Sequence, residues 1–412
     1  MRVALLLGLL GMLGGCVTPS PSGAPRLIPG TWSAWLVSPG GSLPFELELG
    51  EGDAGWAASI INGPERIPIP VVRVEGTRIA LEMPHYDSRI QARINADGTK
   101  LVGHWSKRRG PNRWTRMPFE ALFGAPNPYR ESPRAYLGRW SAHFSLTDDP
   151  AIAVFGEGPD NRVYGTFLTT RGDYRYLAGG VDDGRLRLTA FDGAHAFLFL
   201  AKVTDPGALT GDFWSGDQWH ERWRATIDAE AELPDGFADA IWTGQSSLSD
   251  LAFPDVTGTL RALDDPAFAG RARIVQIFGS WCPNCHDAAL YLTELWNRYA
   301  DRGLSVLGLA FELTGDLERD TEQVRLYVER HGTPYPVLIA GLADKDKASA
   351  QVPLLDRIRA YPTTLFFHGD GRVRAIHSGF AGPATGPANQ NLRRRFESII
   401  EELLAEESAG TE

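Results

Sequence analysis

The chain has 412 residues, 43% of them hydrophobic and 22% charged, which predicts a globular protein of two or three domains. Its formal net charge of −10 at pH 7 argues against a nucleic-acid partner, because such a protein needs a basic face. The basic segment KRRGPNRWTR at 107–116 alternates charged with aromatic residues, and we interpret it as a solvated hairpin.

The first residues predict an export signal. One positive charge, Arg2, precedes an apolar run that is too short to span a bilayer. The letters LGGC at 13–16 resemble the lipobox of bacterial lipoproteins, in which small residues precede the cysteine that receives the lipid. We therefore expect a signal peptide over 1–15, lipidation of Cys16 and a flexible Pro/Ser/Gly tether over 16–29. The protein would then be anchored by lipid in the bacterial cell envelope, facing the periplasm. An ordinary secretory signal is the alternative.

The next two hundred residues are predicted to be a duplicated β unit. Short runs alternate apolar with polar residues, Gly, Asp and Pro interrupt them, and no convincing helix intervenes. Landmarks recur 108 residues apart, since GTW at 30–32 matches GRW at 138–140. We expect repeats over 30–125 and 130–232, either as two barrels or sandwiches or as two halves of one larger barrel.

Tryptophan is concentrated in this β region and at its exit, which hold ten of the twelve tryptophans. Such residues favour packed cores and plugged barrel ends, and a ligand-binding or client-binding face is the alternative. The histidines of the region show no metal-ligand spacing.

From about residue 244 the pattern changes to alternating strands and helices. The expected elements are strands at 271–280, 304–311 and 335–341, helices over 283–302, 316–332 and 345–358, a hairpin at 363–379 and a final helix at 391–407. A fully apolar strand such as 304–311 is typical of the centre of a parallel sheet.

Two cysteines follow the first of these strands in the motif W-C-P-N-C-H. Cys282 would lie in the first turn of a helix, where free backbone N–H groups and the helix dipole favour the thiolate. Cys285 lies one turn later, within reach of a disulfide. If Cys16 is lipidated, Cys282 and Cys285 are the only cysteines left to form a disulfide. A disulfide that closes so short a loop adds little stability. We therefore predict a redox-active Cys282–Cys285 disulfide, with Cys282 as nucleophile, Cys285 as resolving thiol, and no further cofactor.

The segment from about 244 to 405 resembles the thioredoxin-fold family, and within it the TlpA/ResA-like periplasmic thiol-disulfide oxidoreductases. The resemblance rests on W-C-x-x-C after a strand and on AYPTTLFF at 360–367, where the family places a cis-proline opposite the cysteines. It implies an α/β thioredoxin-like domain over 244–408 that follows the all-β tandem repeat. Pro362 would be the cis-proline, and Trp281 would shield the thiols.

The segment departs from the family pattern at two positions. Gln276 stands where cytosolic thioredoxins carry a buried proton-accepting acid. TlpA-like proteins often hold a neutral amide at this position. The family's acid after the second cysteine has no match in frame, because Asp287 is one position off. Glu312, at the end of a strand, is a candidate general base for the buried thiol, and its alternative is a helix-capping or solvated glutamate.

Two other functions are alternatives for this motif, namely haem attachment and peroxide reduction. C-x-x-C-H is also the attachment site of a c-type haem, with His286 as axial ligand. A strand, a tight turn and a long helix around the motif argue against haem, as does the lack of methionine after residue 117. A peroxiredoxin-like thiol peroxidase would need a P-x-x-x-T/S-x-x-C loop, which neither cysteine fits.

The resemblance implies an envelope thiol-disulfide oxidoreductase, and by likeness a reductase. Its partners would be client proteins with disulfides, a membrane thiol donor of electrons and, through the lipid, the membrane. The alternative from another class is a lipoprotein that binds a client or ligand through its β half and carries an accessory redox domain.

Overall fold

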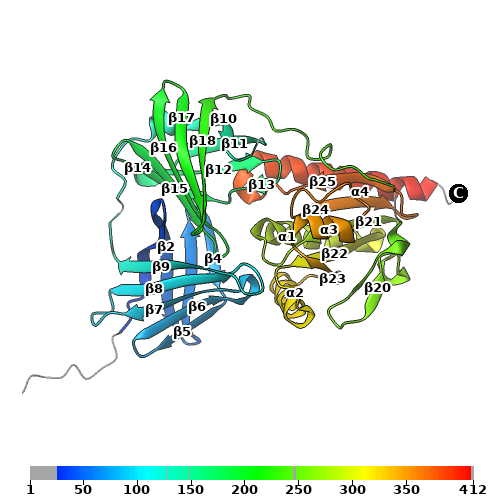
Figure 1. Cartoon of the computed structure of the whole chain (residues 1–412), viewed down its shortest axis with the longest axis horizontal. Helices are drawn as coiled ribbons and strands as arrows, with labels where there is room; N and C mark the ends of the chain where they lie inside the picture. Colours follow the sequence, from blue (N-terminus) through cyan, green and yellow to red (C-terminus); the bar gives the residue numbers. More distant parts are fainter. Residues whose placement is uncertain (1–25, 127, 148, 245–246, 410–412) are drawn as a thin grey trace, which may run out of the picture.

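The computed structural model describes residues 26–126, 128–147, 149–244 and 247–409. The predicted signal peptide and Cys16 lie outside these residues. Two β-rich parts lie on one side of an α/β part that contains the C-terminus (Figure 1). Among the helices described, none combines the length and apolar character that a membrane span requires.

The first β-rich part is one barrel-like antiparallel sheet, here called the first barrel. Its strands are β1 Gly30–Ser38, β2 Gly41–Gly52, β3 Gly55–Asn62, β4 Glu65–Ile69, β5 Val71–Glu75, β6 Arg78–Met83, β7 Ser88–Ile94, β8 Lys100–Arg108 and β9 Trp114–Phe123. The meander returns on itself because β9 pairs with β1, while β4 and β5 are the two edges. Only Pro70 separates these edge strands, and proline cannot donate a ladder hydrogen bond.

The second β-rich part, the second barrel, is a meander that closes into a ring. Its strands are β10 Gly138–Phe144, β11 Pro150–Glu157, β12 Arg162–Thr169, β13 Gly172–Asp173, β14 Leu177–Asp182, β15 Arg185–Phe191, β16 Ala196–Asp205, β17 Ala208–Ser215 and β18 Trp219–Ile227. Pairing of β10 with β18 and of β11 with β12 completes the ring. The β-rich composition and barrel-like sheets expected from the sequence are therefore found.

The two barrels share detailed landmarks at the 108-residue spacing. The indole N–H of Trp32 donates to the carbonyl of Ile28 at 3.0 Å, and that of Trp140 donates to the carbonyl of Tyr136 at 3.1 Å. Both tryptophans are buried, and each first strand pairs with the last strand of its own barrel. The arrangement is two separate sheets and not two halves of one larger barrel.

The α/β part is a five-stranded sheet flanked by helices, preceded by a small hairpin. Its strands are β19 Ala252–Pro254, β20 Leu260–Ala262, β21 Ala272–Phe278, β22 Leu304–Glu312, β23 Val337–Leu342, β24 Thr363–His368 and β25 Val373–Ser378, and its helices are α1 Pro283–Tyr299, α2 Leu317–His331, α3 Lys345–Gln351 and α4 Pro387–Ala409. The main sheet has the order β23-β22-β21-β24-β25, in which β21 to β23 are parallel.

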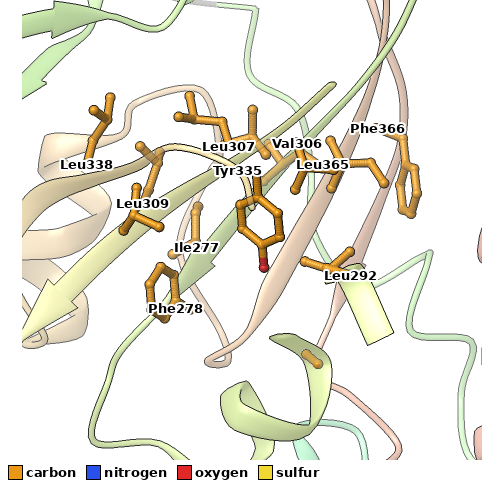
Figure 2. Packing of buried hydrophobic residues seen from close by; sticks show 14 of the residues in the cluster. Ile277, Phe278, Leu292, Val306, Leu307, Leu309, Tyr335, Leu338, Leu365 and Phe366 are labelled. Carbon is orange, nitrogen blue, oxygen red and sulfur yellow. The ribbon is translucent and has the colours of Figure 1, made fainter. Parts of the chain in front are cut away.

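The core of this part lies between the sheet and the helices. Figure 2 shows Ile277 and Phe278 of β21, Leu309 of β22 and Leu292 of α1 among its buried side chains. The prediction of a helix over 345–358 is wrong in length, because α3 ends at Gln351. Proline at position 353 explains the early end, since it lacks an N–H and disfavours helical backbone before it.

The three parts contact one another through buried apolar side chains and through ion pairs. Phe191 and Leu198 of the second barrel belong to the core cluster of the first barrel. Arg319, in α2, forms an ion pair with Asp87 of the first barrel. The hairpin between β12 and β13 reaches the start of α1, so the second barrel lies against the cysteine motif on one side (Figure 1).

Candidate active site at Cys282 and Cys285

The two cysteines lie at the beginning of α1, where the sequence places them. Cys282 caps the helix, and its sulfur accepts the backbone N–H of Cys285 at 3.3 Å. Both cysteines are free thiols, 7% exposed for Cys282 and fully buried for Cys285. Burial, followed by the neighbouring Cys282, raises the pKa of Cys285 well above its usual value. Cys282 is thus the more reachable of the two sulfurs.

The loop before β24 lies against the first cysteine. The Tyr361–Pro362 peptide is cis, and the thiol of Cys282 donates to the carbonyl of Tyr361 at 3.4 Å. Trp281 donates its indole N–H to the carbonyl of Phe311 at 2.9 Å and meets the Tyr361 ring edge-on at 5.5 Å. The structure therefore brings Trp281 and Pro362 together with both cysteines.

Glu312 is buried behind the motif at the end of β22. Its two carboxylate oxygens accept the backbone N–H of Ser280 at 2.8 Å and the Ser280 hydroxyl at 2.6 Å. Burial raises the pKa of Glu312 to about 8, although both hydrogen bonds lower it. With 2% of its surface exposed, Glu312 is not the solvated glutamate of the alternative interpretation. A carboxyl group that titrates near neutral pH can exchange a proton with a neighbouring thiol.

Neither Gln276 nor Asp287 is placed to act as a proton-accepting acid for the thiols. Gln276 is buried in β21, and its side-chain nitrogen has no hydrogen-bond partner among the described residues. Asp287 forms an ion pair with Arg175 of the second barrel, while burial raises its pKa. Asp287 is thus occupied by a contact between domains, which the motif itself could not reveal.

His286 is held within the protein by both ring nitrogens. Its Nε2 lies 2.7 Å from the carbonyl of Ser280, and its Nδ1 lies 2.6 Å from Nε2 of His331. The ring also packs edge-on against Tyr86 of the first barrel at 4.7 Å. Burial lowers the pKa of His286 well below its usual value, so the ring is neutral. Neither nitrogen is free to bind a haem iron, which removes the basis of the haem alternative.

Arg175 joins the three parts beside the motif. Its guanidinium lies 2.8 Å from Glu65 of the first barrel, 3.5 Å from Asp192 of its own barrel, and pairs with Asp287 of α1. Arg175 is 7% exposed, and burial raises the pKa of Glu65 to about 7. Sequence analysis missed this cluster, because the partners of Arg175 are 17 to 112 positions away in the chain and carry no local pattern.

The β12–β13 hairpin fits closely against the active-site helix. The carbonyl of Asp173 accepts the side-chain amide of Asn284 at 3.4 Å, and its carboxylate accepts the N–H of Gly382 at 2.6 Å. A Cβ atom on Gly172 would lie 2.1 Å from the Asn284 amide nitrogen, and Gly172 has a φ of +139°. Only glycine permits this approach, which fixes the second barrel next to Cys282.

A cavity of about 300 Å³ lies beside Cys282. Trp281, Asn284 and Tyr361 form one side, and the second barrel contributes the aromatic side chains of Phe144, Tyr174 and Phe197. The barrel therefore narrows the approach to the nucleophilic sulfur. In the described ranges, no group of three or more His, Cys, Asp or Glu side chains is placed to hold a metal ion.

Known proteins share sequence with part of this chain. The thiol-disulfide oxidoreductase ResA of Geobacillus thermodenitrificans is 24% identical over 154 residues, which are 37% of this chain and 76% of that protein. The thiol:disulfide interchange protein DsbE of Vibrio cholerae is 24% identical over 159 residues, 39% of this chain and 72% of that protein. Part of this chain is homologous to ResA- and DsbE-type thiol-disulfide oxidoreductases.

This ResA/DsbE homology confirms the predicted thioredoxin-like oxidoreductase, at low identity and over little more than a third of the chain. No family model matches the chain. The crystal structure of a thioredoxin-family thiol:disulfide interchange protein from Chlorobium tepidum covers 40% of this chain and 99% of its own, at 22% identity and a TM-score of 0.30. The ResA and DsbE names agree with oxidoreductase activity, and the two barrels lie outside what they describe.

Proposed function

We propose that this protein is a lipid-anchored thiol-disulfide reductase of the bacterial envelope that acts on disulfides of client proteins through Cys282 and Cys285. The observation that carries the proposal is the placement of Cys282. Its sulfur caps α1, accepts the N–H of Cys285 and contacts the Tyr361 carbonyl at the edge of a cavity. These contacts hold the Cys282 sulfur, the less buried of the two, where a client disulfide can approach it.

The reaction is two successive thiol-disulfide exchanges. The Cys282 thiolate attacks one sulfur of the client disulfide, which forms a mixed disulfide and releases the first client thiolate. The Cys285 thiolate then attacks the sulfur of Cys282, which releases the second client thiolate and forms the Cys282–Cys285 disulfide. Two electrons pass to the client, and the two protons of the cysteine thiols pass to the client thiolates.

Glu312 is our candidate for the base that takes the proton of Cys285. The backbone N–H and the hydroxyl of Ser280, two residues before Cys282, hold the carboxyl group, and burial raises its pKa to about 8. A carboxyl group of this pKa is partly ionised at neutral pH, and its ionised form can accept a thiol proton when the second exchange begins.

The direction of electron flow is proposed from the resemblance to TlpA/ResA-like reductases. A membrane thiol donor would restore the dithiol after each turnover. The high pKa of Cys285 agrees with a stable thiol form of the resolving cysteine. Equilibration with glutathione measures the potential, and a value above about −180 mV would argue for an oxidase instead.

The proposed activity is tested with insulin reduction by the full-length protein. Cys282→Ser should lower the rate by at least about a hundredfold, because the attacking thiolate is lost. Cys285→Ser should accumulate mixed disulfides with clients, because the resolving thiol is lost. Undiminished turnover in the Cys282→Ser protein would contradict the proposal.

The proposed anchor is a lipid on Cys16, after removal of residues 1–15 and before the tether over 16–29. We expect a radiolabelled fatty acid to be incorporated into the full-length protein in a bacterial host and not into Cys16→Ser. The matched control is Cys282→Ser, which should keep the label. Label that persists in Cys16→Ser would refute the anchor.

We further propose that the chain consists of a duplicated barrel, over 30–125 and 130–232, and a thioredoxin-like domain over 244–408. The shared tryptophan hydrogen bonds at the 108-residue spacing support the duplication. A client-binding role for the barrels is supported by the cavity, because side chains of the second barrel line it next to Cys282.

A further inference from the structure

A cleft leads from the first barrel to Cys282. It has a volume of about 830 Å³ and lies between the β8–β9 hairpin of the first barrel, the second barrel and residues Trp281 and Leu313 of the α/β part. It adjoins the cavity at Cys282, because both are lined by Thr147, Arg171, Tyr174, His195, Phe197 and Trp281. The hairpin is the segment KRRGPNRWTR, so the interpretation of that segment as merely solvated is wrong for Lys107, which is buried.

Cationic side chains dominate this cleft although the chain as a whole carries −10. Its lining includes Lys107, Arg108, Arg109, Arg113 and Arg171. Glu221 is its one carboxylate among the described residues, and it already accepts the indole N–H of Trp219 at 3.0 Å. The cleft therefore has a local positive potential that attracts negatively charged groups.

Three of these cations have no carboxylate partner among the described residues, namely the buried Lys107, which donates to the carbonyl of Ala194 at 3.0 Å, and the exposed Arg109 and Arg113. Arg108 and Arg171 form ion pairs with Asp87 and Asp149, both at 2.5 Å. Arg109 and Arg113 are exposed, and within the described ranges neither has a carboxylate oxygen within 4 Å. The guanidinium of Arg109 lies 3.4 Å from the Thr115 hydroxyl, which in turn donates to Asp217. An incoming carboxylate could pair with either arginine without displacing a salt bridge.

The restricted access to Cys282 favours a single extended peptide segment as the ligand. Cys282 is only 7% exposed, and the second barrel covers it from one side. A sulfur recessed in this way is reached more easily by a disulfide in an extended peptide segment than by one on a folded surface. Trp114 and Trp219 line the outer cleft with 42% and 46% of their surfaces exposed, which offers apolar contact area.

We propose that the cleft binds an extended client segment whose disulfide is flanked by acidic side chains, and that Arg109 and Arg113 pair with those carboxylates. The proposal rests on the proposed function, because the bound disulfide is reduced by the two exchanges described above. Electrons and protons balance as they do there, and the arginines only position the client. The barrels would thus select for acidic clients, while Cys282 supplies chemistry that is not selective by itself.

The test uses the reduced full-length protein and matched probes. Two peptides carry the same cystine, one with glutamates and one with glutamines on either side. The neutral 2-hydroxyethyl disulfide tests the redox chemistry alone, and glutathione disulfide tests a small anionic disulfide. We expect kcat/KM for the glutamate peptide to exceed that for the glutamine peptide by about tenfold at low salt, and the ratio to fall as salt is added.

Substitution of the free arginines should reduce this ratio. Arg109→Gln and Arg113→Gln should each lower it by about threefold, as expected for exposed ion pairs. The matched control is Arg394→Gln, in α4, which is exposed and whose side chain contacts Asn391 instead of a carboxylate. The control should keep the full ratio. Because Arg109 and Arg113 are both exposed, their substitution should not unfold the protein, which thermal melting checks.

The outcomes separate this proposal from the proposed function. Equal kcat/KM for the two peptides, with 2-hydroxyethyl disulfide reduced, would overturn the acidic preference and leave the reductase in place. Glutathione disulfide reduced as efficiently as the glutamate peptide would overturn the extended peptide as the ligand. Failure to reduce any of the probes would overturn the proposed function itself.

Discussion

Glu312 is the residue through which pH acts most directly on the loop before Cys282. Its pKa is about 8 in the fold and 4.5 without burial. Between these values the folded state binds more protons than the unfolded state, so stability falls as pH rises. The contribution of protonated Glu312 is complete below about pH 4.5 and is lost as pH rises through about 8.

Glu312→Gln should remove this pH dependence, because the amide stays neutral. The free energy of unfolding of the variant, minus that of the unchanged protein, should rise by about 1 kcal/mol per pH unit between about pH 6 and 8. Urea unfolding at several pH values measures it, and other raised acids such as Glu65 cancel in the difference. Parallel pH profiles for the two proteins would show that Glu312 does not carry this burial penalty.

Individual residues differ in how far the sequence reveals them. Cys282, Cys285 and Trp281 belong to one contiguous motif, so their proximity follows from chain connectivity. Pro362 and Glu312 required the resemblance or the strand pattern, since they come to the motif from other strands. Arg175 could not be predicted, because its partners are 17 to 112 positions away and nothing local marks them.

At the scale of elements, local patterns predicted most strands and helices well. The expected strand at 304–311 corresponds to β22, Leu304–Glu312, and the expected helix over 316–332 to α2, Leu317–His331. Both have clear signals, namely an apolar run and a glycine that ends the helix in left-handed backbone at a φ of 54°. Pairing of the first with the last strand of each barrel could not be predicted in this way. Strands β1 and β9 are about ninety residues apart, and the alternation of apolar and polar residues does not specify which strands pair.

At the scale of the whole molecule, the position of the two barrels beside the thiols could not be predicted from the sequence. The net charge of −10 conceals a basic cleft. Four of its five cations lie in the segment 107–116, but the position of that segment beside Cys282 depends on how the three parts assemble. The ion pair of Asp87 with Arg319 joins residues 232 positions apart. Each part carries a recognisable pattern of its own, whereas the surfaces between the parts mix polar and apolar residues and give no periodic signal.

The Arg175 cluster is the contact on which this assembly should depend most. Arg175 is the buried cation that Glu65, Asp192 and Asp287 share, one from each part of the molecule. Arg175→Gln removes the positive charge and leaves buried carboxylates that must be protonated or repel each other. We expect the free energy of unfolding at neutral pH to fall by about 3–5 kcal/mol.

The matched control for this prediction is Arg162→Gln. Arg162 also belongs to the second barrel and pairs with a glutamate of the first, Glu46, at 2.6 Å, but the two side chains are 25% and 31% exposed. Water screens this pair, so its loss should lower the free energy of unfolding by less than about 1 kcal/mol. Urea unfolding of both variants decides the matter. Similar small losses would mean that the carboxylates around Arg175 take up protons without penalty, and that apolar contacts such as Phe191 in the core of the first barrel hold the parts together instead.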